Sequence, residues 1–278
     1  MKSLITTLLV TTLFCPTQNQ LVNPPSSPGL ASYSLNSVAD KNKLSLTVRI
    51  RPVDPGTDEV NILHAQKTAM QLFDLVEKNH LIVAGKSESK LKDEVTSLAK
   101  EKFGVETHWH KKIVRSGVNT MAIYPDNPAD RIIQKDDILF IDFGIVVDGW
   151  ESDVAKTYVL GNDPKKLKLK SDVDKAWHET QAWYKKQTTL KSSDLFQFVL
   201  DKAKQYGYTF PGIIAGHIVG KYPHEQPADP KSFDLDVHPT NHNNIFLLDA
   251  NGNKRHWILE MHFVDEKNKI GGYTEQLL

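Results

Sequence analysis

The stretch from Asp137 to Thr157 constrains the fold more than any other part of this chain. It contains two strand-like segments, 138–147 and 150–160, with Asp148-Gly149 between them. An Asp-Gly pair between two such segments is a strong signal for a β-hairpin, because both residues tolerate a positive φ. The sequence therefore predicts two antiparallel strands joined by a two-residue turn.

Two acidic residues lie on one face of this predicted hairpin. A two-residue turn places Val147 opposite Trp150 and Gly144 opposite Asp153, while Asp142 shares a face with position 144. Asp142 and Asp153 are then diagonal neighbours, about 7–8 Å apart at the backbone. Two carboxylates in an apolar sheet repel each other and lose hydration, so a hard divalent cation between them would stabilise both. The alternative is that one Asp is exposed or caps another element.

The charge balance limits the kinds of partner. The 278 residues include 34 Lys and Arg and 34 Asp and Glu, so the formal net charge is zero. A neutral chain without basic runs argues against a nucleic acid or an anionic membrane surface as the partner. The length is sufficient for one large domain or two small domains with a real core.

The N-terminus has the pattern of an export signal. Lys2 precedes an uncharged apolar run, 4–14, which is too short to span a bilayer but typical of a signal peptide. We predict a signal peptide over residues 1–20, a linker over 21–57, and an exported protein, periplasmic or secreted, whose mature chain has no transmembrane segment. The alternative is a frayed apolar terminus. Cys15 is the only cysteine, and a lipid anchor there fits poorly with Phe14 and Pro16 beside it.

The rest of the chain alternates between helical and strand-like patterns. Apolar spacing predicts helices over 58–79, 91–103, 173–184 and 195–203, with Ser87 or Ser89 capping the second and Gly104 and Gly207 ending the second and fourth. Strands are expected over 213–219, 244–248 and 257–264. Each half thus consists of two helices followed by antiparallel strands that carry acidic residues, which predicts an α+β fold of two pseudo-symmetric halves.

The second half adds three polar residues in apolar, strand-like surroundings. His217 is flanked by Gly216 and Gly220, Glu260 follows Trp257-Ile258-Leu259, and Glu275 follows Gly271-Gly272-Tyr273-Thr274. Taken alone, a histidine in such a place is more often a hydrogen-bonded core residue, and a glutamate is more often a residue at the edge of a sheet. Two Asp, one His and two Glu in this order favour a metal site.

In these motifs, residues 58–278 resemble metallopeptidase family M24, which includes methionine aminopeptidase, aminopeptidase P, prolidase and creatinase. Within the family, the chain most resembles the short bacterial members that are similar to Xaa-Pro peptidases. The resemblance implies an α+β pita-bread fold and a catalytic domain over 58–278. It rests on Trp109–Thr120, Asp142-Phe143-Gly144, Ser152–Thr157, Gly216–Glu225, Glu260 and Glu275.

The resemblance also implies a ligand set. Asp142 would bind one of two divalent ions, and Asp153 and Glu275 would bridge both. His217 and Glu260 would complete the coordination of the other ion. The ions are expected to be Mn, Co, Fe or Zn, and these donors do not select among them.

Three residues would contribute to catalysis by the same resemblance. Glu260 would relay the proton from water to the leaving amine, and His224 would hydrogen-bond the scissile amide or the tetrahedral intermediate. His110 resembles a histidine on the substrate side, although a surface histidine is the alternative. His262, two residues after Glu260, would either reach the site or pack in the core.

The expected function is therefore a dinuclear metal-dependent hydrolase that releases an N-terminal residue from peptides, with Xaa-Pro peptides among the candidates, by means of a metal-bridging hydroxide. One alternative is a creatinase-like amidase or C–N hydrolase that acts on a small non-peptide amide. The other is a non-catalytic binding protein of this fold. The partner would be a peptide or small amide, and a homodimer is left open.

Overall fold

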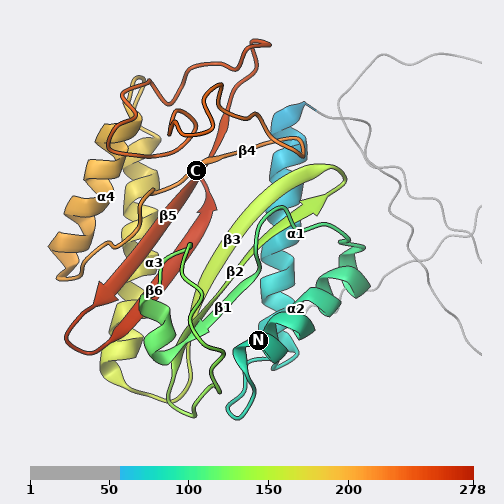
Figure 1. Cartoon of the computed structure of the whole chain (residues 1–278), viewed down its shortest axis with the longest axis vertical. Coiled ribbons are helices and arrows are strands. Elements are labelled where there is room, and N and C mark those ends of the chain that lie inside the picture. The colour runs from blue at the N-terminus through green and yellow to red at the C-terminus, as the bar shows by residue number, and fades with distance from the viewer. Residues whose placement is uncertain (1–56) are drawn as a thin grey trace, which may run out of the picture. The chain divides into compact units, whose positions relative to one another are not determined.

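The computed structural model describes residues 57–278. The predicted signal peptide, Cys15 and the predicted linker up to residue 56 lie outside the described residues. Residues 57–278 contain four α-helices, one 3-10 helix and six strands (Figure 1): α1 (Asp58–Lys78), α2 (Glu88–Phe103), β1 (Ile113–Ser116), η1 (Gly117–Met121), β2 (Ile138–Val147), β3 (Trp150–Val159), α3 (Pro164–Tyr184), α4 (Ser192–Tyr206), β4 (Ile218–Val219), β5 (His256–Asp265) and β6 (Ile270–Leu277).

The six strands form one antiparallel sheet in the order β1-β2-β3-β6-β5-β4. The first three strands come from the first half of the described chain and the last three from the second half, in mirrored order. The two halves meet where β3 pairs with β6, at Ala155 and Glu275. This order confirms the prediction of an α+β fold with two pseudo-symmetric halves.

The hairpin of β2 and β3 has the predicted register. Val147 pairs with Trp150 and Gly144 pairs with Asp153. Both turn residues have a positive φ, 51° at Asp148 and 81° at Gly149, as a two-residue turn of this kind requires. The turn chemistry therefore determines which side chains of β2 and β3 share a face.

The ends of the helices also follow from local sequence. The Ser87 hydroxyl accepts a hydrogen bond from the backbone of α2, and Gly104 ends that helix at φ 68°. Gly207 ends α4 in the same left-handed conformation, at φ 85°. Asp163 caps α3 with its carboxylate, and Pro164 occupies the first turn, where no N–H is needed. The four predicted helices are confirmed, but α3 begins at Pro164, nine residues before the predicted start at 173.

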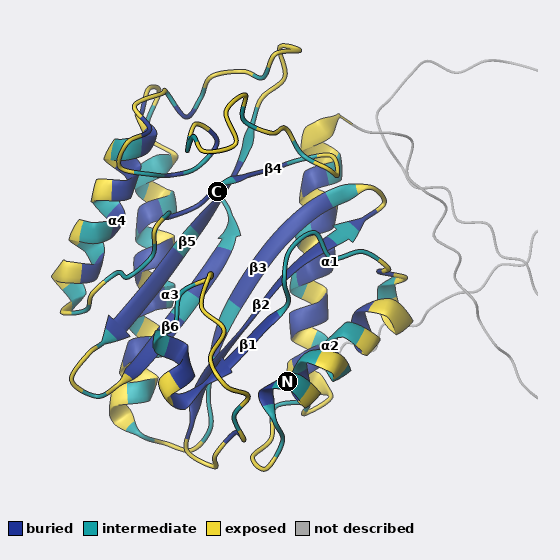
Figure 2. Ribbon diagram, in the orientation of Figure 1, coloured by how far each residue is buried: buried dark blue, intermediate teal, exposed yellow. Residues whose placement is uncertain are grey.

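Each half has its own apolar core, formed between its two helices and its strands. In the first half, Ile141, Phe143 and Ile145 of β2 pack toward α1 and α2. In the second half, α3 and α4 pack against Leu259 and Met261 of β5. Figure 2 shows the strands largely buried, with exposed residues on the outer surfaces of the helices and on the loops. Because side chains alternate along a strand, the polar residues of β2 and β5 project from the opposite face of the sheet.

Two predicted strands of the second half are wrong or too long. Only Ile218–Val219 of the stretch 213–219 is a strand, and the residues before it form a loop around Gly216 at φ 144°. The stretch 244–248 is a turn, because the side chain of Asn244 accepts hydrogen bonds from the backbone N–H groups of Phe246 and Leu190. A short polar side chain that binds nearby backbone competes with strand pairing. Within residues 57–278, no helix has the length and apolarity that crossing a membrane would require.

Candidate metal centre

Three carboxylates lie in one row across four strands. Asp142 on β2 pairs with Ala155 on β3, Ala155 pairs with Glu275 on β6, and Glu275 pairs with Glu260 on β5. Directly opposed residues face the same side of a sheet, so these carboxylates share one face. Asp153, two residues before Ala155, adds a fourth to that face. The small side chain of Ala155 leaves the space between them open.

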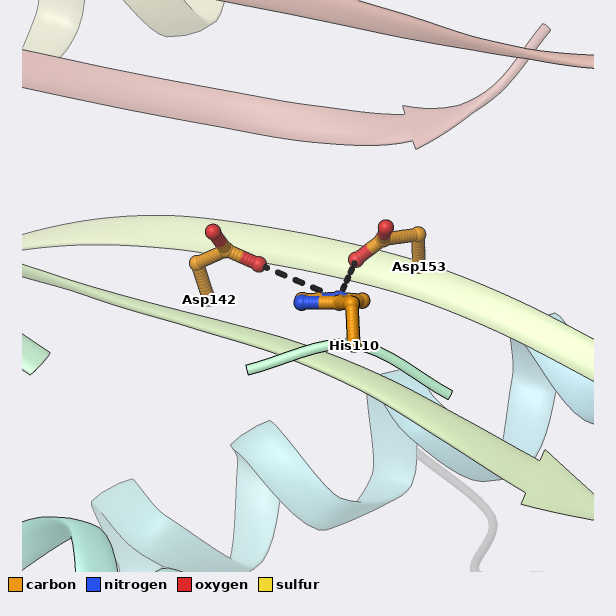
Figure 3. Close-up of side chains that lie close together, drawn as sticks. All are labelled: His110, Asp142 and Asp153. Atoms are coloured by element: carbon orange, nitrogen blue, oxygen red, sulfur yellow. Dashed lines mark hydrogen bonds and ion pairs between the residues drawn. The ribbon is translucent and has the colours of Figure 1, made fainter. Parts of the chain in front are cut away.

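His110 approaches this row from the loop before β1. Its Nε2 lies 3.0 Å from Oδ1 of Asp153 and 3.7 Å from Oδ1 of Asp142 (Figure 3). Its Nδ1 lies 2.7 Å from the carbonyl oxygen of Lys111. A carbonyl only accepts, so Nδ1 carries a proton and the other nitrogen is directed at the carboxylates. That nitrogen must therefore either be protonated too or face a cation.

Gly144 makes room for this imidazole. It lies opposite Asp153 on β2, and a Cβ there would lie 1.9 Å from Cδ2 of His110. Any other residue at this position would therefore displace the ring. The glycine of the Asp142-Phe143-Gly144 motif thus has a steric role beside the acidic residues.

His217 repeats the arrangement in the second half. Its Nδ1 lies 2.9 Å from the carbonyl oxygen of Ile218, and its Nε2 lies 3.5 Å from Oδ2 of Asp153. The same Nε2 lies 3.5 Å from Glu275 and 3.8 Å from Glu260. Hydrogen bonding of one ring nitrogen to a carbonyl is the usual support of a histidine that binds metal through the other. Asp153 thus lies between two imidazoles, with one oxygen toward each.

The carboxylates are crowded enough to shift their own pKa values. Burial raises the pKa of Asp142 well above its ordinary range. Burial and the charge of Glu275 raise the pKa of Glu260 to about 8, and burial and Asp153 raise that of Glu275 to about 7. Burial also disfavours the ionised form of Asp153, but His110 outweighs it and lowers the pKa to about 2.

The imidazoles respond in the opposite direction. Burial opposes the charged form of His110, but Asp153 and Asp142 outweigh burial and raise its pKa to about 10. The pKa of His217 is also raised well above its ordinary value, because hydrogen bonds to Asp153 and Glu275 overcome burial. Most carboxylates and both imidazoles of this cluster therefore bind protons more tightly than usual, which shows that the cluster has an excess of negative charge. A divalent cation would offset that charge.

Two further observations fit a bound metal. Oδ1 of Asp142 is buried and has no hydrogen-bond partner among the described residues. Residues 57–278 also contain two groups of three ligand atoms within 4.8 Å of one another: His110, Asp142 and Asp153, and Asp153, His217 and Glu275. Asp153 belongs to both groups. Oxygen donors with imidazole nitrogen suit Mn, Fe, Co and Zn.

His224 stands beside this cluster, on the loop after β4. Its Nδ1 lies 2.7 Å from Oε2 of Glu151 on β3. Glu151 is 1% exposed and was not among the residues predicted for the site. Its position two residues before Asp153, on the same strand face, is the one sequence signal that could have found it.

Two aromatic residues of the site were also missed. The ring of Trp109 contacts His110, His217 and His224 edge-on, at centroid distances of 4.7, 5.2 and 5.4 Å. The hydroxyl of Tyr273 donates a hydrogen bond of 2.9 Å to Oε2 of Glu260, its near neighbour across the β5–β6 pair. Both residues lie in stretches that the sequence analysis singled out, but neither carries a signal that assigns its side chain to the site.

His262 does not reach the cavity. Its Nε2 donates a hydrogen bond of 2.8 Å to the carbonyl oxygen of Thr120, and its ring packs against Phe140 and Tyr273. Burial lowers its pKa to about 4, so the ring is neutral. Of the two alternatives considered from sequence, packing in the core is the correct one.

The cluster forms the floor of a cavity of about 450 Å³. His110, Asp142, Asp153, His217, His224, Glu260 and Glu275 all line it. The remaining wall is largely apolar and comes from both halves, with Ile113, Ile123, Tyr124, Phe140, Ile213 and Phe233 as its main residues. A cavity with an apolar wall and a few convergent polar groups is typical of a site for a small ligand or a short peptide segment. The residues predicted for the site are thus gathered in one place.

A model of metallopeptidase family M24 matches residues 61–255, well over half of the chain. The chain belongs to metallopeptidase family M24. The match confirms the resemblance seen in the motifs. It ends before Glu260 and Glu275, which the sheet brings to the matched residues through the β3–β6 pair.

Sequence relatives cover parts of the chain. A methionine aminopeptidase of Borreliella burgdorferi is 32% identical over 111 residues, which are 38% of this chain and 42% of that protein. An uncharacterized peptidase of Staphylococcus epidermidis is 28% identical over 191 residues, which are 61% of this chain and 54% of that protein. The chain therefore spans about half the length of these curated relatives.

Solved structures share the pita-bread fold. A prolidase of Thermococcus sibiricus superimposes with a TM-score of 0.63 at 23% identity, over 79% of this chain and 55% of that one. A methionine aminopeptidase of Thermotoga maritima gives a TM-score of 0.59 at 17% identity, over 82% of this chain and 94% of that one. At these identities the likeness establishes the fold and not the substrate.

Proposed function

We propose that the protein is a dinuclear metal-dependent hydrolase that releases the N-terminal residue of a peptide. The observation that carries this proposal is the position of Asp153, which directs one oxygen toward His110 and the other toward His217. A carboxylate placed in this way suits two neighbouring ions. The family membership and the fold support the same reaction class.

Five residues of this chain would hold the ions: Asp142, Asp153, His217, Glu260 and Glu275. Two divalent ions held there would lower the pKa of a water and offset negative charge that develops on the substrate. The residues of the chain fix where that chemistry takes place. Because all four carboxylates come from paired strands, their spacing depends on the register of the sheet and not on loops.

The proton movements are assigned to residues of the second half. Tyr273 donates to Oε2 of Glu260, and Oε1, which lies 3.8 Å from Nε2 of His217, would accept a proton from the attacking water. Glu260 then delivers that proton to the amine nitrogen as the C–N bond breaks. His224 would hydrogen-bond the scissile amide or the tetrahedral intermediate through Nε2.

The cavity favours a peptide whose first side chain is uncharged. Its wall is apolar, and the described cationic residue that lines it, Arg115, already donates to the carbonyl oxygens of Ala122, Ile123 and Asp126. Xaa-Pro peptides and peptides that begin with Met are both candidates, in line with the prolidase and methionine aminopeptidase relatives. A small non-peptide amide is the second candidate, because the cavity would also hold a molecule of that size.

The test is a mixed pool of peptides with Xaa-Pro, Met-Xaa and unrelated N-termini, read by mass spectrometry. The full chain is loaded with Mn²⁺ or Co²⁺, and a chelator serves as the control. We expect loss of one N-terminal residue that the chelator abolishes. If no peptide is cleaved although two ions are bound per chain, the substrate is a non-peptide amide. If no ion is bound either, the hydrolase proposal is wrong and a binding protein remains.

We also propose that the protein is exported, on the basis of Lys2 and the apolar run at 4–14. Fractionation of expressing cells, with mass spectrometry of the intact chain, is the measurement. The expected result is a shortened chain outside the cytosol, and an uncleaved chain in the cytosol would contradict it. A homodimer stays a prediction that light scattering would test.

A further inference from the structure

Glu151 forms a buried connection between the hairpin of the first half and the histidine loop of the second. Its Oε2 accepts hydrogen bonds from Nδ1 of His224, at 2.7 Å, and from the backbone N–H of Gly220, at 3.1 Å. Its Oε1 accepts from the backbone N–H of His224, at 3.1 Å. Both oxygens are therefore occupied, although the side chain belongs to neither the cavity wall nor the carboxylate row.

We propose that Glu151 is a positioning residue that holds His224 with Nδ1 protonated and Nε2 directed into the cavity. The proposal rests on the proposed function, in which Nε2 of His224 faces the scissile amide or the tetrahedral intermediate. An ionised carboxylate can only accept, so the Nδ1 it contacts must carry the proton. The remaining nitrogen is then the one that can meet the substrate.

The charge of Glu151 strengthens this role. A buried carboxylate needs several N–H donors, and Nδ1–H of His224 joins two backbone N–H groups in this role. Glu151 thereby favours the form of His224 whose proton lies on Nδ1. In that form Nε2 accepts a hydrogen bond, so it can hold an N–H or O–H group of the substrate or of the tetrahedral intermediate. A carboxylate plays the same part for the histidine of serine proteases.

The loop itself does not depend on this side chain alone. Backbone hydrogen bonds already join the two segments, from Glu151 N–H to the carbonyl of Gly220 at 2.9 Å and from Tyr222 N–H to that of Gly149 at 2.8 Å. The ring of Trp109 makes a T-shaped contact with the imidazole of His224 and limits its movement on another side. What the carboxylate adds is the choice of protonated nitrogen and the direction of the ring. A role in catalysis is therefore separable from a role in stability.

The test compares Glu151→Gln with the wild-type full chain. Glutamine has nearly the same shape, but its NH₂ group must face either Nδ1 of His224 or a backbone N–H, so one hydrogen bond is lost and the proton can move to Nε2. We expect kcat on the fastest-cleaved peptide of the pool to fall about tenfold to a hundredfold. KM and the number of bound ions should stay within twofold. Glu151→Asp, which keeps the charge, should recover part of the lost kcat.

The spectroscopic readout is ¹⁵N-histidine NMR of the Zn²⁺-loaded full chain, with His224 assigned by the signal missing in His224→Gln. In the wild type the proton should reside on Nδ1. In Glu151→Gln the signals should shift toward a mixture of tautomers or toward Nε2–H. This measurement needs no substrate.

Glu88 offers a matched control. It is also a buried glutamate, 5% exposed, whose carboxylate accepts from Ser116 and Asn119, but it does not line the cavity. Glu88→Gln should lower the melting temperature while kcat stays within twofold of the wild type and the His224 signals do not move.

Two results would overturn the proposal. One is unchanged His224 signals in Glu151→Gln. The other is a loss of stability without a selective loss of kcat, as expected for Glu88→Gln. If Glu151→Gln does not fold, the NMR signals and kcat of Glu151→Asp are measured instead. The shorter carboxylate should draw the His224 ring away from its position in the cavity and lower kcat. If the wild type cleaves no peptide, the proposed function fails, whereas the NMR result still tells whether Glu151 orients the ring.

Discussion

The two halves of the sheet present the same imidazole arrangement to Asp153 but hold it in different ways. His217 is part of the sheet edge, because its carbonyl accepts from Ile258 N–H at 2.8 Å and it forms a bridge with Asp236. His110 lies on a loop, and the neighbouring Trp109 ties that loop to β2 and β3 through the carbonyls of Gly144 and Ser152.

This difference suggests different functions for two similar rings. A ligand held by strand pairing is fixed before an ion arrives, which suits a permanent metal ligand. A ring on a loop can move between the ion and a substrate. We therefore expect His217 to be required for metal binding and His110 for turnover. The predictions below test that division, starting with the residue that both rings share.

Asp153→Asn should have the largest effect. It removes the charge that faces both His110 and His217 while keeping the shape of the side chain. We expect kcat/KM to fall by at least about 10²–10³-fold and at least one ion to be lost per chain. Metal analysis and peptide kinetics are the measurements, with circular dichroism as the control for folding. Full activity in this variant would contradict a shared dinuclear centre.

His217→Ala should impair metal binding, whereas His110→Ala should impair turnover. His217→Ala should weaken binding of one ion by about tenfold to a hundredfold or more, because a nitrogen donor is lost next to three carboxylates. His110→Ala should keep both ions and lose about tenfold to a hundredfold in kcat. Calorimetric titration with Mn²⁺ separates the two outcomes. Equal loss of metal in both variants would show that His110 is a ligand as well.

Gly144→Ala should reproduce part of the His110→Ala phenotype. The added Cβ would overlap Cδ2 of His110 and lie 2.5 Å from Nε1 of Trp109, so the ring must leave its position. We expect about a tenfold loss of kcat with both ions retained. The double variant with His110→Ala should be no worse than His110→Ala alone, because the glycine acts through that ring. Additive losses would mean that Gly144 acts on something else.

His262→Gln should leave the site intact and change only the response of stability to acid. The pKa of His262 lies near 4 in the folded chain, below its ordinary value of 6.5, because of burial. The unfolded chain thus binds more protons between pH 6.5 and 4, and the free energy of unfolding falls as the pH drops through that window. The loss is at most about 3 kcal/mol.

Urea unfolding at pH about 7.5 and about 5, with chelator present throughout, measures this effect. The variant should lose less stability than the wild type between the two pH values, while its peptide kinetics at the higher pH stay unchanged. An identical loss in both proteins would mean that other groups cause the acid sensitivity.

The parts of the fold that local chemistry determines could be predicted from the sequence. The Asp148-Gly149 turn sets the register that puts Asp142 and Asp153 on one face, and Ser87, Gly104 and Gly207 mark helix ends. The stretch 244–248 could not be predicted, because its apolar residues resemble a strand while the Asn244 side chain forms a turn instead.

The residues that position the site were harder to find than the residues predicted as ligands. Asp142, Asp153, His217, Glu260 and Glu275 stand out as polar residues in apolar segments, in the order that the family motifs have. Glu151, Trp109 and Tyr273 gain their roles only from contacts between segments that are distant in sequence. A single sequence contains no record of such contacts, so their functions had to come from the structure.

The pairing of β3 with β6 has a consequence for how the chain completes its folding. The proposed ligands are divided between the halves, so ions bound by Asp153 and Glu275 would also hold β6 against β3. Anything that binds only the folded state shifts the folding equilibrium in proportion to its concentration. The metal concentration would then determine how well β6 resists proteolysis, as well as whether the site is active. A chain deprived of its ions should fray first at Ile270–Leu277.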